Sequence, residues 1–294
     1  MKKTLIALAA VAVAGAASAQ VSMSGEIGYG WQKSLDGTAA MRQTDGSVTL
    51  KASEDLGGGL SVSGATTFDL KGRSAVSAEN TTLTVAGGFG AVTLGAIEAC
   101  QWGANAAGAP ISLGNGYDGY ASHALVDSCG NIDIAIYTLP KMVDGLTLKV
   151  MTAEAGANAV GSGTGSVGVQ VVRAEYKTGA LYAGIDYSSF TEALDGESRT
   201  RLTVSYDMGV AKVGYAMSKR SYINDAVSDI SVSAPLGAMN VGFLYAKRGD
   251  NKGTYLGADY ALSKRTKVNV SYGSADVNGS GNQNESRVKL YHSF

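Results

Sequence analysis

The sequence predicts an all-β protein, a transmembrane antiparallel β-barrel of about 16 strands with one long loop folded into its lumen. From residue 20 onward, stretches of about ten residues alternate between apolar and polar side chains, and each ends at a break. Short and long breaks follow one another along the chain. Beyond residue 19 there is no apolar run of about eighteen residues, so a chain of this kind crosses a membrane only as a closed barrel that pairs its backbone groups.

The first 19 residues have the features of a secretory signal peptide. Lys2 and Lys3 give a positive start, residues 4–17 form an apolar run that is short for a bilayer span, and residues 17–19 (ASA) are a small-residue cleavage site. A transmembrane anchor is the alternative, and the short run fits it less well. We therefore expect residues 1–19 to be removed and residues 20–294 to form one exported barrel domain.

The alternation is clearest in three segments of the second half of the chain. Residues 201–208 (RLTVSYDM) place Leu, Val, Tyr and Met on one face and Arg, Thr, Ser and Asp on the other, and residues 267–273 and 287–294 alternate in the same way. The predicted strands span residues 20–34, 47–55, 60–70, 78–87, 91–98, 130–138, 145–154, 166–177, 180–190, 198–208, 210–220, 226–235, 239–248, 254–262, 266–275 and 285–294.

The breaks distinguish a membrane barrel from a soluble β-sandwich, which also alternates. Short breaks contain Gly or a tight turn, as in residues 57–59 and 87–90, whereas long breaks such as 35–46 and 276–284 are polar. Short periplasmic turns that alternate with longer outer loops are typical of outer-membrane barrels. We therefore expect the strands to run up and down around one barrel.

The longest break runs from Cys100 to Cys129 and does not alternate. A loop of this length is usually functional or disordered, and the two cysteines that bracket it argue against disorder. In an exported chain two cysteines are more often paired than free, so we expect a Cys100–Cys129 disulfide, which would contribute on the order of 3 kcal/mol. We predict that this loop folds into the lumen and narrows the pore.

The composition excludes several classes of function. Without Lys2 and Lys3 the chain has 22 basic and 25 acidic residues, a net charge of −3, which gives no reason to expect a nucleic-acid partner. No CxxC or HExxH motif suggests a metal or cofactor. His123 lies near Ser122 and Asp127, but a triad is defined by geometry rather than by proximity in sequence, so we predict no enzymatic activity.

Charged side chains on the inner face are the candidate functional residues, because charges along a pore set its selectivity. We predict a basic wall of Lys51, Lys149 and Arg173, opposed by Asp118 and Asp127 in the long loop, with Arg201 as a further pore-lining residue. A generally solvated lumen with no single selective residue is the alternative, since a one-residue error reverses the faces. The charges predicted to face inward are Glu26, Lys51, Asp69, Lys149, Arg173, Glu175, Lys177, Asp186, Arg199, Arg201, Asp207 and Lys212.

Four segments resemble the Gram-negative general diffusion porins, in particular those of beta-proteobacteria. Residues 54–60 (EDLGGGL) resemble the first periplasmic turn of that family, 260–266 (YALSKRT) its last turn, and 91–95 (AVTLG) the strand that enters its constriction loop. The terminal Phe294 resembles the signal read by the barrel-assembly machinery. The chain departs from the family at residues 96–97 (AI), where a basic residue is expected, and at 115–119 (NGYDG), where an acidic cluster is expected.

The resemblance implies a homotrimer of sixteen-stranded barrels in the outer membrane of a Gram-negative bacterium, in contact with lipid and lipopolysaccharide. Each barrel would be a water-filled channel for small hydrophilic solutes and ions, narrowed by its third outer loop and working without a cofactor. The alternatives are a substrate-selective channel and an adhesin or hydrolase that uses the barrel as a scaffold.

Overall fold

The computed structural model describes residues 20–33, 37–71, 76–98, 104–111, 131–155, 167–191, 194–276, 279 and 281–294. The predicted signal peptide, the two cysteines, Asp118 and Asp127 lie outside these residues. In the described part of the chain, no helix has the length and apolar character needed to cross a membrane. The strands are β1 (Gln20–Lys33), β2 (Ala40–Gly57), β3 (Leu60–Asp69), β4 (Ser77–Gly87), β5 (Gly90–Glu98), β6 (Asn131–Thr138), β7 (Leu146–Ala155), β8 (Val167–Thr178), β9 (Leu181–Phe190), β10 (Ser198–Asp207), β11 (Lys212–Arg220), β12 (Val227–Leu236), β13 (Met239–Arg248), β14 (Asn251–Ala261), β15 (Thr266–Asp276) and β16 (Asn282–Ser293).

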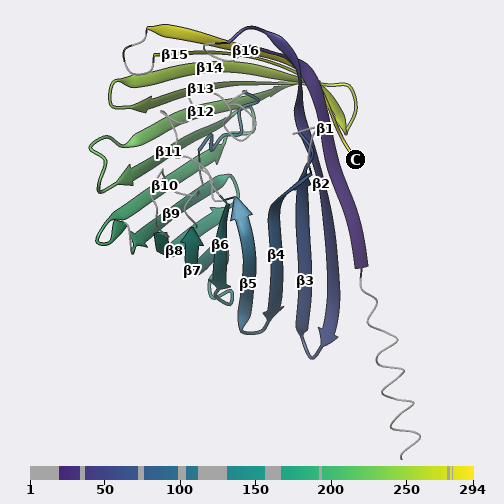
Figure 1. The fold of residues 1–294 in the computed structure, drawn as a ribbon, viewed down its shortest axis with the longest axis vertical. Coiled ribbons are helices and arrows are strands. Elements are labelled where there is room, and N and C mark those ends of the chain that lie inside the picture. Colours follow the sequence, from purple (N-terminus) through teal and green to yellow (C-terminus); the bar gives the residue numbers. More distant parts are fainter. Residues whose placement is uncertain are drawn as a thin grey trace, which may run out of the picture.

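These strands form one closed antiparallel barrel (Figure 1). Each strand pairs with its neighbours in sequence, and β16 pairs back onto β1. Closure leaves no strand edge without backbone partners, which a lipid environment requires. The predicted fold class and the strand number of sixteen are confirmed.

The turn between β2 and β3 needs glycine because its backbone has positive φ angles. Gly57, Gly58 and Gly59 have φ values of 77°, 62° and 79°, in the left-handed region that other residues rarely adopt. Asp55 accepts a hydrogen bond from the amide of Gly57 over 2.8 Å and closes the turn. The EDLGGGL segment is therefore a turn in which the residue types match the backbone.

The strands present an apolar outer face and a mainly polar inner face. Val172, Ile185 and Leu256 are 60%, 49% and 54% exposed on the outside. Asp186 and Ser231, on the opposite face of their strands, are 1% and 0% exposed. The alternation seen in the sequence therefore separates side chains that face lipid from those that face the lumen.

Three strands begin three residues or more before their predicted starts. β2 begins at Ala40 rather than at residue 47, β14 at Asn251 rather than at 254, and β16 at Asn282 rather than at 285. The extra residues of β2 are mostly polar, and they pair with β1 across a bulge at Gly28/Tyr29. Outside the apolar band of the membrane a strand can be polar on both faces, so alternation does not mark its end.

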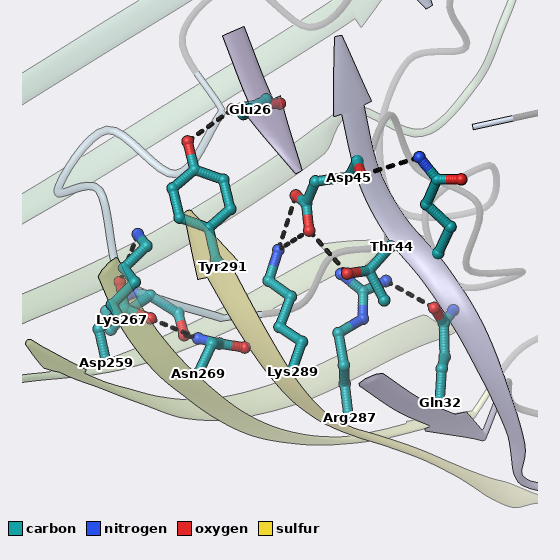
Figure 2. A network of polar contacts seen from close by, with 12 residues as sticks. Glu26, Gln32, Thr44, Asp45, Asp259, Lys267, Asn269, Arg287, Lys289 and Tyr291 are labelled. Carbon is teal, nitrogen blue, oxygen red and sulfur yellow. Dashed lines mark hydrogen bonds and ion pairs between the residues drawn. The ribbon is translucent and has the colours of Figure 1, made fainter. Parts of the chain in front are cut away.

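Polar side chains also cross the seam where β1 closes the barrel (Figure 2). Lys289 Nζ on β16 lies 2.8 and 2.9 Å from the two carboxylate oxygens of Asp45 on β2, so the pair spans the intervening strand β1. A Cβ on Gly28 of β1 would lie 2.1 Å from Asp45 Oδ2. Because Gly28 has no side chain, Lys289 and Asp45 can pair directly beneath β1.

One part of the inner face is apolar, although the alternation in the sequence predicted polar side chains there. Ile134, Ala153, Val169, Val171 and Phe190 from β6–β9 form a buried cluster on the inner side. Leu194 and Tyr222, from connections between strands, are among the residues that pack against it. This apolar band borders the charged wall described next.

Candidate functional site

Three of the predicted basic residues lie in one row across the inner wall. Strand register pairs Lys149 on β7 with Arg173 on β8, Arg173 with Asp186 on β9, and Asp186 with Arg201 on β10. Residues that are paired in this way point to the same face. We call Lys149, Arg173, Asp186 and Arg201 the basic row.

Asp186 holds the centre of the basic row. Its carboxylate accepts hydrogen bonds from Arg201 Nε over 3.0 Å to both oxygens, and Arg201 Nη2 lies 2.7 Å from Oδ2. Arg173 Nη2 donates to the same Oδ2 over 3.0 Å. The side chains of Asp186, Arg201 and Arg173 are 0%, 7% and 14% exposed. Multiple charge-assisted bonds fix both guanidinium groups in place.

Lys149, at the end of the basic row, pairs with a second carboxylate. Its Nζ donates to Glu175 Oε2 over 2.7 Å, and the hydroxyl of Tyr182 donates to Glu175 Oε1 over 3.0 Å. The Lys149 and Glu175 side chains are 28% and 19% exposed, more open than the centre of the row. Lys149 therefore presents its charge closer to water.

A second row of cations runs beside the first. Arg199 on β10 pairs in register with Ser188 on one side and with Arg220 on the other, so two arginines stand directly opposite each other. Arg199 lies over the ring of Phe190 at 5.8 Å. The alternation predicted Arg199 to face inward but missed Arg220, which continues the inward face of β11 from Lys212. The inner faces of β10 and β11 therefore carry two further cations beside the basic row.

The charges on this wall do not balance. Among the described inner-face residues of β7–β11, the cations outnumber the carboxylates. The cations are Lys149, Arg173, Lys177, Arg199, Arg201, Lys212 and Arg220, and the carboxylates are Glu175, Asp186 and Asp207. The described side chains of this wall therefore carry a net positive formal charge.

The other predicted site residues do not join the wall. Lys51 faces inward on β2, is exposed, and pairs with Ser22 and Ala65, far along the sheet from the basic row. Phe294 exchanges two backbone hydrogen bonds of 3.0 Å with Gly25, which fixes the C-terminus to β1. The opposing acidic side and the Cys100–Cys129 disulfide remain predictions, because those residues lie outside the described chain.

Part of the long loop lies against the adjoining part of the inner wall. The amide of Asn105 donates to Asp229 Oδ1 over 3.2 Å, and the amide of Ala107 donates to Ser231 Oγ over 3.0 Å. Asp229 and Ser231 are 6% and 0% exposed on the inner face of β12. Residues 104–111 are therefore inside the barrel, whereas the narrowing of the pore by residues 112–130 stays a prediction.

The sequence matches the Gram-negative porin family over residues 4–280. The chain belongs to this family. Porins are channels rather than enzymes, so this porin forms a diffusion channel in the outer membrane of a Gram-negative bacterium. A search of curated protein sequences finds no significant match.

Solved structures share the fold of this porin at low sequence identity. The anion-selective porin from Comamonas acidovorans is 20% identical, with a TM-score of 0.70 over 94% of this chain and 100% of its own. The trimer form of OmpT from Vibrio cholerae is 14% identical, with a TM-score of 0.63 over 94% and 100%. A mutant of the Rh. blastica porin is 15% identical, with a TM-score of 0.61 over the same shares.

Proposed function

We propose that this porin passes small hydrophilic solutes and ions by passive diffusion and favours anions. The observation that carries the proposal is that cations outnumber carboxylates among the described inner-face residues of β7–β11. In a narrow aqueous pore, charges fixed on the wall attract counter-ions and repel ions of the same sign. Neither an energy source nor a cofactor enters this mechanism.

Two features of the wall give its charge an effect on passing solutes. The arginines of the basic row have fixed positions because Asp186 bonds them, so they offer anions a pre-organised surface. Arg199 and Arg220 add charge beside them. The Comamonas acidovorans porin, which is described as anion-selective, has the same fold.

We propose further that three copies of this porin assemble in contact with membrane lipid and lipopolysaccharide, and that the barrel-assembly machinery reads Phe294. The Vibrio cholerae OmpT structure is described as a trimer, which supports this state for a barrel of the same fold. The apolar outer face, with residues such as Val172 at 60% exposure, requires lipid or a second barrel as its neighbour.

Reversal potentials of the purified porin in planar bilayers under a salt gradient test the proposal. We expect the wild type to favour anions, Arg220→Gln to favour them less, and Lys141→Gln to match the wild type. Lys141 is the matched control, because it pairs with Asp144 between β6 and β7 and its side chain is 71% exposed. A wild-type reversal potential on the cation side would contradict the proposed preference. Saturable block by one solute would indicate the substrate-selective alternative.

A further inference from the structure

Three glycines on the inner wall next to the basic row leave room for another part of the chain rather than forming turns. Gly214 on β11, Gly242 on β13 and Gly257 on β14 lie within strands, and none is among the residues with positive φ. An added Cβ would lie 2.4 Å from Ala107 N at Gly214, 2.5 Å from Pro110 Cδ at Gly242 and 2.1 Å from Pro110 O at Gly257. A side chain at any of them would collide with residues 104–111.

Polar groups hold the same segment beside these glycines. Asp229 and Ser231 on β12 accept the amides of Asn105 and Ala107, and Asn269 Nδ2 on β15 donates to Pro110 O over 3.0 Å. Asn269 is 5% exposed and also donates to Asp259 Oδ1, which fixes its orientation (Figure 2). The contacts therefore run across five consecutive strands, β11 to β15.

The segment has a fixed shape of its own. Asn105 has a φ of 50° and its side chain makes two hydrogen bonds to Ala109, accepting from its amide over 2.9 Å and donating to its carbonyl over 3.0 Å. The amide of Gly108 donates to the carbonyl of Asn105 over 2.8 Å. Ala107 and Ala109 are 4% and 5% exposed, so their small side chains pack against the wall.

We propose that Gly214, Gly242 and Gly257 form a trough that seats residues 104–111 against the wall, and that the depth of this seat sets the pore cross-section. The inference rests on the proposed function, because it treats the lumen as a conducting pore. In this arrangement the trough governs conductance while the basic row governs ion preference. The three glycines, Ser231 and Asn269 are positioning residues that act through the segment.

Two classes of variant should change unitary conductance in opposite directions. Gly242→Val fills the trough, and since ordinary contacts begin at 3.4 Å while the added Cβ would meet Pro110 at 2.5 Å, the segment must move by about 1 Å toward the pore axis. We expect a lower conductance. The double variant Ser231→Ala with Asn269→Ala removes two anchoring bonds without a change in net charge, so we expect a higher and noisier conductance.

The measurement is single-channel current in symmetric salt, with heat-modifiable gel mobility as the check that each variant folds. Gly64→Ala is the control for glycine replacement in a strand, because its Cβ would meet only Thr82 O at 3.8 Å, and it should conduct like the wild type. Gly242→Ala replaces the valine variant if that barrel does not assemble. Folded variants with wild-type conductance would overturn the trough, whereas a wild type that does not conduct would overturn the proposed function instead.

Discussion

Replacement of Asp186 by asparagine should destabilise the barrel and increase its preference for anions. The Asp186 carboxylate is 0% exposed and binds both Arg173 and Arg201. Loss of one partner from a buried ion pair typically costs about 3–5 kcal/mol, because the remaining charge has no compensation. The two guanidinium groups are 14% and 7% exposed to a wet lumen, so we expect about 3 kcal/mol, the lower end of that range.

The assay is urea unfolding of the refolded porin, followed by heat-modifiable mobility, together with the reversal potential in a salt gradient. Glu175→Gln is the matched control, since the Lys149–Glu175 pair is 28% and 19% exposed and a pair of this kind contributes at most about 1 kcal/mol. Asp186→Asn should lower stability well beyond Glu175→Gln. Equal stability of the two variants, or a shift of Asp186→Asn toward cations, would refute the reasoning.

Three other substitutions test separate parts of the barrel. Lys149→Glu places an acid where a lysine now lies 2.7 Å from Glu175, and its reversal potential should shift toward cations; an unchanged value would remove Lys149 from the selective wall. Asp45→Ala removes the carboxylate that pairs with Lys289, whose side chain is only 12% exposed, and should cost about 3 kcal/mol in urea unfolding, while a wild-type midpoint would show that the seam does not depend on this pair. Phe294→Ala should reduce the amount of porin in outer-membrane fractions, measured by immunoblot, while protein refolded in detergent still conducts; equal amounts would argue against a terminal assembly signal.

The fold could be predicted because lipid and water impose a period of two on every strand that crosses the membrane. The prediction was wrong where that constraint ends. Residues 40–46 of β2 include Gln43, Thr44 and Asp45, whose polar side chains indicated a loop. They lie in a strand because the backbone pairing with β1 continues beyond the apolar band and does not depend on side-chain polarity.

The candidate site could be predicted only in part, because alternation gives the face of a residue but not its cross-strand partner. Partners depend on the stagger of all the strands around the barrel, which no local pattern encodes. Thus Lys149, Arg173 and Arg201 were correctly placed on the inner face, but their alignment with Asp186 became visible only in the structure. The trough glycines gave no signal either, since the chain contains 40 glycines.

The apolar band on β6–β9 has a consequence for the unfolded polypeptide before it inserts into the membrane, rather than for the folded pore. Around Val171 and Val172, β8 carries branched hydrocarbon side chains toward both faces, so neither side of this stretch would be shielded by its own polarity. Uncharged β-branched stretches of this kind associate with one another when exposed. We expect a periplasmic chaperone to cover residues 167–172 until insertion, and this stretch to be the first to aggregate if that chaperone is missing.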